Sequence, residues 1–410
     1  MKSKIPENLC TVPWRGFSNE PDGRARPCCI YEGFITDEAG NDLFMQKDTI
    51  EDIFHSPYMQ KLREEFRQNK KPIGCDICWK DEESGYRSKR KIYGGYVVDW
   101  KEEPEFPIDF HMILSNSCNL KCRSCGAAYS STWQKENRKH DGDSGFEMPF
   151  NQPGDNETVF WKNRHAWYSN LESLEIVGGE PMYIKQWHTV FDELIELGYA
   201  KNIYLNMSTN CTIMMPDLIK KIKDNFRQVC IHLSIDGTGK IFEYLRHPAK
   251  WDQVYSNMKT YHDLLDSDNF VIVITNTVSW LNVLEMSKIH SLVKKEFPKF
   301  KIWYNPIHSP KFMSLEHIPE DLKKHIAKQI ENYDWEEQAS DIEGIKNLMF
   351  SHKTDPNHSR HYLKEFDEID RRRNENIWDV MPNEYLPFLS KYRSPAMIAT
   401  DRDETGDNMT

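Results

Sequence analysis

Three cysteines follow an apolar run near the middle of the chain, in the order Cys118-Asn-Leu-Lys-Cys122-Arg-Ser-Cys125. The run before them, residues 106–115, is apolar enough to form a buried strand, so we expect the cysteine loop to begin where that strand ends. Three thiolates at this spacing can hold a [4Fe-4S] cluster and leave one iron without a protein ligand. Such an iron can bind a small molecule and pass an electron to it, whereas a four-cysteine site is closed. The motif therefore predicts a cluster that takes part in chemistry.

This C-x3-C-x2-C pattern resembles the cluster motif of the radical S-adenosylmethionine (SAM) superfamily. The usual motif has an aromatic residue before the last cysteine, and Ser124 stands there in this chain. The alternative is a zinc site, which would normally need a fourth Cys or His nearby. Residues 126–133 contain neither. The resemblance implies that Cys118, Cys122 and Cys125 are the ligands of a SAM-binding [4Fe-4S] cluster.

A second motif follows a short apolar run that begins at Leu174 and breaks into Gly178-Gly179-Glu180-Pro181. Two glycines permit unusual dihedral angles and a close approach of the backbone to a ligand, while an acid can accept hydrogen bonds from an ammonium group. The motif is similar to the Gly-Gly-Glu of the superfamily, which binds the amino group of the SAM methionine. The alternative is a simple turn, which is the commoner structure for such a sequence when it stands alone.

Three further apolar runs, 203–210, 230–237 and 270–276, end in polar residues and alternate with helix-like segments. This rhythm predicts a parallel sheet with right-handed crossovers, in which ligands gather at the carboxyl ends of the strands. A nucleoside would therefore lie near Asn210 and Asn276. The resemblance adds Ser234 and Asp236 as contacts of the SAM ribose and Arg246 as a partner of the SAM carboxylate. The alternative for Arg246 is a solvated charge at a helix end.

Counting the runs near residues 110, 175, 204, 232, 272 and 303 gives six strands, the number in the partial (β/α)6 barrel of the superfamily. We therefore expect an α/β fold with three parts. These are a small cysteine-rich N-terminal domain at 1–103, the barrel at 104–310, and a mainly helical C-terminal extension at 311–410. The helices expected around the sheet include 187–198, a segment from Pro216, and 251–265.

The N-terminal part carries a second cysteine set, Cys10, Cys28, Cys29, Cys75 and Cys78, interrupted by a helical stretch at 50–66. A C-x2-C pair with distant cysteines is typical of a metal site in a reducing cell. The order resembles the auxiliary-cluster modules called SPASM and twitch domains, which in most relatives follow the barrel. A closed [4Fe-4S] cluster needs four ligands, so one of the adjacent pair is spare, and we choose Cys28 as the ligand. The alternative is a structural zinc site with four thiolates.

Several segments are expected to have no part in the chemistry. Cys230 lies within a strand and is expected to be a small buried hydrophobe, and Cys211 to be an ordinary loop cysteine. The basic run 87–91 is expected to be a solvated helix face, and the run 371–376 is expected to be exposed. The polar and acidic residues 400–410 are expected to be disordered.

The composition excludes several classes of protein. A net charge of −11 disfavours nucleic acid as the main substrate, because phosphate binding needs a positive surface. No apolar stretch approaches membrane-spanning length, and the first eight residues lack the apolar core of a signal peptide. Ten cysteines, most of them in motif spacing, suit a reducing compartment, so we expect a cytoplasmic protein.

The resemblance implies an enzyme that reductively cleaves SAM to a 5′-deoxyadenosyl radical, which takes hydrogen from a substrate. The substrate class is a peptide or a small molecule such as a sugar, and the auxiliary [4Fe-4S] cluster would transfer electrons. A reductant protein such as flavodoxin or ferredoxin would be a partner. No catalytic side chain is assigned. Two alternatives stay open, a non-catalytic iron–sulfur carrier or scaffold and a zinc-binding interaction protein.

Overall fold

The computed structural model describes residues 5–95, 98–142, 158–354 and 356–392, with the side chains of 356–359 left out. The acidic end 400–410, predicted to be disordered, lies outside the described residues. One eight-stranded sheet forms the centre of the molecule, in the order β2-β1-β3-β4-β5-β6-β7-β8. All neighbouring pairs are parallel except β1 with β2. Strands β2 and β8 form the two edges, so the sheet stays open, as predicted for a partial barrel.

The six strands expected from the apolar runs are all present. They are β3 (Asp109–Met112), β4 (Ser173–Ile176), β5 (Tyr204–Thr209), β6 (Gln228–Ser234), β7 (Phe270–Val278) and β8 (Lys301–Pro306). Residues alternate between buried and half-buried along β4, β5 and β6. Buried side chains such as Leu205 and Met207 join the main core with the helices, whereas Glu175 and Asn206 lie on the opposite, polar face.

Two strands of the N-terminal part extend this sheet and were not predicted. They are β1 (Gly16–Asn19) and β2 (Ala25–Arg26), and β1 pairs with β3 through Gly16 and Asp109. A Cβ atom on Gly16 would lie 1.7 Å from Asp109 O, so the approach of the two strands requires glycine. Both strands are short and lack an apolar run, which is the signal used for the other six. The sheet is continuous across the boundary expected at 103/104, and both domain boundaries stay predictions.

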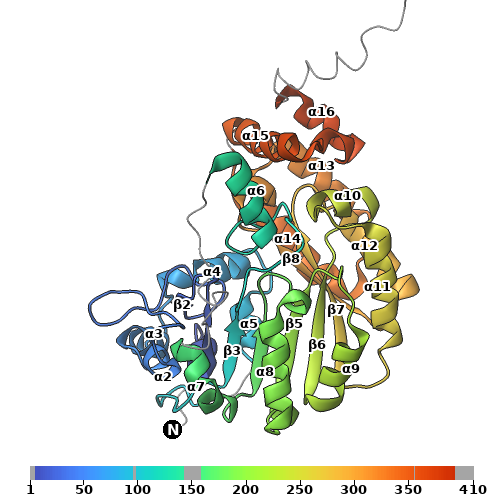
Figure 1. Cartoon of the computed structure of the whole chain (residues 1–410). Helices are drawn as coiled ribbons and strands as arrows, with labels where there is room; N and C mark the ends of the chain where they lie inside the picture. Colours follow the sequence, from blue (N-terminus) through green and yellow to red (C-terminus); the bar gives the residue numbers. More distant parts are fainter. Residues whose placement is uncertain (1–4, 96–97, 143–157, 355, 393–410) are drawn as a thin grey trace, which may run out of the picture.

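The expected helices around the sheet are present as α8 (Lys185–Glu196), α9 (Pro216–Asn225) and α11 (Trp251–Asp263), together with α12 (Glu285–Glu296). Figure 1 shows these four around the outside of the sheet. Other helices are α1 (Val12–Arg15), α4 (Asp76–Glu83), α5 (Lys89–Tyr93), α6 (Ser131–Asp141), α7 (Val159–Tyr168) and α10 (Gly239–Leu245).

The helical stretch expected at 50–66 is two helices, α2 (Ile50–Phe54) and α3 (Pro57–Arg67). Pro57 has no N–H to donate within a continuing helix, and the Ser56 side chain accepts a hydrogen bond from Met59 N to cap the second helix. The stretch is therefore helical as expected, with a break before a proline that favours the first position of a new helix.

The C-terminal extension is helical, as predicted, with α13 (Glu320–Glu331), α14 (Ala339–Met349), α15 (Pro356–Arg373) and α16 (Leu386–Leu389). A second hydrophobic core joins it to α10, α12 and β8. Figure 1 shows α13, α15 and α16 at the upper end of the molecule near α6 and α10, far from α2 and α3. The expectation of an exposed run at 371–376 was wrong for Arg373, whose side chain is 0% exposed, although that of Arg371 is 75% exposed.

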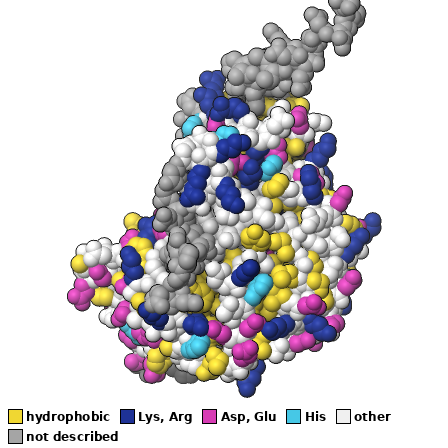
Figure 2. Space-filling view, viewed as in Figure 1, with side chains coloured by type: hydrophobic (Ala, Val, Ile, Leu, Met, Phe, Trp, Pro, Cys, Tyr) yellow, Lys and Arg dark blue, Asp and Glu magenta, His cyan; other side chains and the backbone are white. Residues whose placement is uncertain are grey.

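Basic and acidic side chains are interspersed over the face shown in Figure 2, as the modest net charge would suggest. Within the part of the chain that the structure describes, no helix combines the length and the apolar character needed to cross a membrane.

A histidine between two carboxylates joins the N-terminal part to the C-terminal extension. His308 Nε2 lies 3.2 Å from Asp81 Oδ1 in α4, and Nδ1 lies 3.6 Å from Glu316 Oε1. Burial opposes the charged form, but the two carboxylates outweigh it and raise the pKa of His308 to about 9. The imidazolium therefore stabilises the contact between these two parts of the protein.

A pH prediction follows from this raised pKa. The stabilisation is complete below about pH 6.5, the ordinary pKa, and is lost as the pH rises through about 9. We expect the wild type to lose on the order of 2 kcal/mol of unfolding free energy across this window, measured by urea unfolding. His308→Gln should remove most of this pH dependence. His361→Gln, which replaces an exposed histidine, serves as the control. An unchanged pH dependence in His308→Gln would contradict the assignment.

Candidate functional site

The three cysteines of the central motif lie in the loop between β3 and α6, and all three are half-buried. Cys125 N donates to Cys122 O at 3.0 Å, which makes the end of the loop a tight turn. Cys118 N donates to Ser131 Oγ at 3.2 Å, which fixes the start of the loop to the first turn of α6. The apolar strand and the helix cap thus hold the cysteines at the carboxyl edge of the sheet.

The loop is chemically suited to a thiolate-bound cluster. Burial, together with the neighbouring Cys122, raises the pKa of Cys118 and of Cys125 to about 12. Burial also raises the pKa of Cys122, although Arg246 acts against it. Three thiolates this close repel one another unless cations lie between them, and iron supplies that charge. The donor set therefore fits a [4Fe-4S] cluster.

The Gly-Gly-Glu turn packs directly against the segment that leads into the cysteine loop. Gly178 and Gly179 have φ of 80° and 56°, which favours glycine. A Cβ atom on Gly179 would lie 2.5 Å from Ser117 O, so only glycine permits this approach. Glu180 N donates to Ser117 O at 2.8 Å. The backbone of the turn is thus hydrogen-bonded to, and closely packed against, the backbone that leads into the cysteine loop.

The Glu180 carboxylate is fully buried and joins the ends of β4 and β5. Its Oε1 accepts from Met182 N at 3.1 Å and from Thr209 Oγ1 at 2.8 Å, and its Oε2 accepts from Asn210 N at 2.7 Å. Burial raises the pKa of Glu180, while these donors lower it. Oε2 keeps one lone pair free for a further donor. The next side chain, Asn210, has its Nδ2 4.0 Å from Cys118 Sγ and donates to Asn119 Oδ1 at 2.9 Å.

Arg246 and Asp236 form a buried ion pair beside the cysteine loop. Arg246 Nε lies 2.8 Å from Asp236 Oδ2, and its Nη1 lies 3.9 Å from Cys122 Sγ. Burial opposes the charge, but Asp236 and Cys122 outweigh it and raise the pKa of Arg246. Arg246 is only 8% exposed, so the alternative of a solvated helix-end charge is wrong.

The other two predicted SAM contacts lie at the same strand ends. Asn276 donates to Ile235 O at 2.8 Å, and its Oδ1 is buried with no partner among the described residues. Ser234 pairs in register with Thr275 and is half-buried. Whether these residues, Arg246 and the Gly-Gly-Glu turn bind SAM stays a prediction.

Four of the N-terminal cysteines line one small cavity. They are Cys10, Cys28, Cys75 and Cys78, and two cations, Lys89 and Arg90, are among the other lining residues. Burial raises the pKa of Cys75, and the nearby Cys28, Cys10 and Cys78 raise it further. Across the described residues no group of three or more Cys, His, Asp or Glu side chains could hold a single metal ion. Four thiols around one cavity match the number of ligands in a closed [4Fe-4S] cluster.

Cys29 lies outside this set. It lines an adjoining hollow with Lys89 and Glu175, and Lys89 Nζ donates to Cys29 Sγ at 2.8 Å. Burial raises the pKa of Cys29 to about 11, against the effect of Lys89. The geometry supports the choice of Cys28 over Cys29 as a cluster ligand, which stays a prediction.

Lys89 bridges the N-terminal cysteines and the polar face of the sheet. Its Nζ lies 3.4 Å from Glu175 Oε2, which also accepts from Tyr93 OH at 3.0 Å and lies 2.9 Å from His111 Nδ1. Burial opposes the charge of Glu175, but Lys89 and His111 outweigh it and hold the pKa well below its usual range. The expectation that the run 87–91 is a solvated face was therefore wrong for Lys89 and for Arg90, because both are largely buried.

The polar face of the sheet carries a row of side chains in register. His111 pairs with Glu175, Glu175 with Asn206, and Asn206 with Cys230. Cys230 Sγ lies 3.5 Å from His232 Nε2, so Cys230 belongs to this polar face and is not a core hydrophobe as expected. Cys211 is fully buried with its Sγ 3.8 Å from Val254 O. The alternation of polar and apolar residues along the strands could have indicated this row of polar side chains. The alternation does not say, however, which face of the sheet is open.

Two family models match the chain. Residues 112–286 match the radical SAM superfamily, and residues 10–80 match SPASM, an iron–sulfur cluster-binding domain. The predicted resemblance is thus confirmed, with the auxiliary module preceding the barrel. These domains take a [4Fe-4S] cluster with SAM and auxiliary iron–sulfur clusters respectively, so the predicted cofactors are confirmed and the zinc alternatives are disfavoured. No curated protein matches the chain.

Solved structures of low similarity also match. One is native anSMEcpe with bound AdoMet, at 20% identity and a TM-score of 0.38, and another is native anSMEcpe with bound AdoMet and Cp18Cys peptide, at 19% and 0.34. Both matches cover 55% of this chain. The chain spans 59% and 58% of those chains, less than two thirds of their length. Similarity at this level carries no conclusion about substrate or partners.

Replacing Glu180 tests its role between the strand ends. In Glu180→Gln at least one of the three donors faces an amide N–H₂ group in place of an acceptor. We expect a loss of about 1–3 kcal/mol in unfolding free energy, measured with denaturant. The control Glu196→Gln, at the exposed end of α8, should change stability by less than about 0.5 kcal/mol. Wild-type stability in Glu180→Gln would show that the three hydrogen bonds matter little.

Proposed function

Because the chain carries a radical SAM domain and an N-terminal SPASM iron–sulfur domain, we propose that it is a radical SAM enzyme that abstracts a hydrogen atom from its substrate. The observation that carries this proposal is the meeting of three separate motifs at one edge of the sheet. The cysteine loop follows β3 and the Gly-Gly-Glu turn follows β4, while Asp236 follows β6 and Arg246 follows α10. The turn and the Arg246–Asp236 pair each contact the segment that carries the cysteines, through Glu180 N to Ser117 O and through Arg246 to Cys122. A carrier protein with a closed cluster needs neither the turn nor the pair.

Cys118, Cys122 and Cys125 would hold the SAM cluster. Once reduced, the cluster supplies the electron that splits SAM into methionine and a 5′-deoxyadenosyl radical, which then takes a hydrogen atom from the substrate. Glu180 and the carbonyls of the glycine turn would accept the SAM ammonium group, since Glu180 Oε2 keeps a free lone pair. Arg246 would bind the SAM carboxylate, because its guanidinium already lies beside Cys122.

The nucleoside of SAM would lie along the ends of the neighbouring strands. Asp236 and Ser234 would contact the ribose. Asn276 offers a buried carbonyl oxygen with no partner among the described residues, and Asn210 offers an amide that points toward Cys118. These groups are preorganised by backbone contacts, which reduces the entropy lost when SAM binds.

The N-terminal cluster would accept an electron from the substrate radical after hydrogen abstraction, and a side chain on the polar face of the sheet would take up the proton that the substrate then releases. Cys10, Cys28, Cys75 and Cys78 would hold this cluster, and closed four-thiolate ligation suits electron transfer. Lys89 lies between that cavity and Glu175, so charged groups connect the cluster to the polar face of the sheet.

The substrate would occupy this polar face. The row of His111, Glu175, Asn206 and Cys230 offers hydrogen-bond donors and acceptors. His232 lies next to Cys230, and its ring centroid is 6.1 Å from that of Trp303. Such a surface suits a polar substrate, either a peptide or a small molecule such as a sugar. A reductant protein such as flavodoxin or ferredoxin would supply the electron. We also propose a cytoplasmic location, because ten free cysteines suit a reducing compartment.

Iron content and SAM cleavage test the proposed function together. After anaerobic loading we expect about eight irons per chain and reductant-dependent formation of 5′-deoxyadenosine. Cys118→Ala should retain about four irons and lose cleavage. A fully loaded wild type that cleaves no SAM, with or without candidate substrates, would instead favour the iron–sulfur carrier.

The adjacent cysteines provide a matched pair of variants for the auxiliary site. Cys28→Ala should lower the iron content by about four per chain, while Cys29→Ala should leave it unchanged, because only Cys28 lines the four-cysteine cavity. Both variants should still cleave SAM. Iron loss in Cys29→Ala with a normal content in Cys28→Ala would reverse the assignment.

A further inference from the structure

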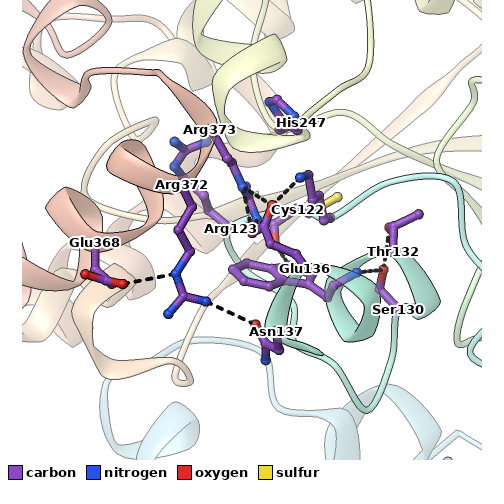
Figure 3. A network of polar contacts seen from close by, with 12 residues as sticks. Cys122, Arg123, Ser130, Thr132, Glu136, Asn137, His247, Glu368, Arg372 and Arg373 are labelled. Carbon is purple, nitrogen blue, oxygen red and sulfur yellow. Dashed lines mark hydrogen bonds and ion pairs between the residues drawn. The ribbon is translucent and has the colours of Figure 1, made fainter. Parts of the chain in front are cut away.

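The C-terminal extension, described as residues 311–392, lies beyond both family-model matches, yet its longest helix reaches the cysteine loop. Figure 3 shows α15 beside this loop, with Arg373 directed toward Glu136 and Arg372 directed toward Asn137. Two separate groups of contacts make the connection. One centres on Arg123 and the other on Arg373.

Arg123 stands inside the cluster motif, between Cys122 and Cys125, and its side chain is 0% exposed. Its Nη2 is paired with Asp370 and lies 2.8 Å from Glu375 Oε2. The guanidinium also lies over the Tyr244 ring at 3.3 Å from the centroid. Asp370 and Glu375 belong to the C-terminal extension. The positive charge of Arg123 within the motif is therefore balanced by carboxylates 247 and 252 residues away in the sequence.

The two carboxylates are themselves fixed. Asp370 Oδ1 accepts from Tyr244 OH at 2.9 Å, and Oδ2 accepts from Ile377 N at 2.6 Å. Glu375 Oε1 lies 2.7 Å from His247 Nδ1, and His247 O accepts from Lys121 N in the cysteine loop at 2.8 Å. The loop is therefore held through its backbone and through Arg123 by the same group of residues.

Arg373 forms the second connection. Its Nε and Nη2 donate to Glu136 Oε1 at 3.1 and 3.0 Å, and Glu136 is also paired with Lys121 of the loop. The Arg373 guanidinium lies over the Trp133 ring at 4.3 Å from the centroid. Trp133 Nε1 donates to Cys122 O at 2.7 Å. Arg373 thus supports Glu136 and Trp133, two side chains of α6 that contact the loop. The contact of Trp133 is with the carbonyl of Cys122, a proposed cluster ligand.

We propose that the C-terminal extension helps to hold the loop of the SAM-cluster site in place, with Asp370 and Arg373 as positioning residues. Asp370 acts through Arg123, and Arg373 acts through Glu136 and Trp133. The inference rests on the proposed function, because it takes the three loop cysteines as cluster ligands. A site of this kind needs its groups held within about 0.5 Å of the working geometry, and such buried networks supply that support. Replacing groups that orient metal ligands typically lowers affinity or activity by about 10- to 100-fold.

The test uses the loaded full-length protein and the variant Asp370→Asn, which removes the charge opposite Arg123 with little change of shape. We expect SAM cleavage to fall by about 10- to 100-fold. The electron paramagnetic resonance spectrum of the reduced protein, recorded with and without SAM, should lose or alter its SAM-dependent change. This SAM-dependent change in the spectrum reports the SAM cluster alone, since a closed cluster does not bind SAM. Replacing a residue with a merely structural role would leave the change intact. Iron content at the auxiliary site should stay normal.

Arg371→Gln is the matched control, because Arg371 lies on the same helix and pairs only with Glu368 at the surface. It should keep the wild-type rate and spectrum. If Asp370→Asn does not fold, Arg373→Gln carries the same expectation and leaves the Arg123–Asp370 pair untouched. Wild-type cleavage and spectra in the folded variants would overturn the positioning roles alone. A wild type that binds iron but never cleaves SAM would overturn the proposed function.

Discussion

Buried cations surround both cysteine sites, and the arrangement of the rest of the protein depends on them. A thiolate in a low-dielectric interior is costly unless positive charge lies near it. Arg246 and Arg373 supply that charge at the central loop, and Lys89 and Arg90 supply it at the N-terminal cavity. Each of these cations is itself largely buried, so each in turn requires a carboxylate partner.

Several carboxylates that pair with buried cations come from distant segments and connect the three parts of the chain. Glu175 on the sheet pairs with Lys89 of the N-terminal part, and Asp370 of the C-terminal extension pairs with Arg123 of the loop. His308 between Asp81 and Glu316 makes a third link. Removing one partner of such a pair leaves an uncompensated buried charge and typically costs about 3–5 kcal/mol. The two proposed cluster sites thus depend on contacts between all three parts.

Much of the fold could be predicted because its signals are local. The six barrel strands and their helices follow from apolar runs and helical periodicity, and the cysteine and glycine motifs are continuous in sequence. The errors share one cause. Lys89, Arg90 and Arg373 stand in basic runs that resemble solvated helix faces, yet each pairs with a carboxylate in the fold. The partners of Lys89 and Arg373, Glu175 and Glu136, lie far away in the sequence. Strands β1 and β2 were missed because the pairing of β1 with β3 and of β2 with β1 gives no local apolar signal.

By itself, the sequence determined the chemistry of the protein, since residue types and short spacings decide which atoms a cluster or a SAM molecule can bind. It also determined the order of the strands along the chain. The tertiary structure alone decided which of Cys28 and Cys29 lines the four-cysteine cavity and which cations stand beside each thiol. It also revealed that a helix near residue 370 holds a loop near residue 123. These outcomes depend on long-range packing and charge balance, which act between residues that no local pattern connects.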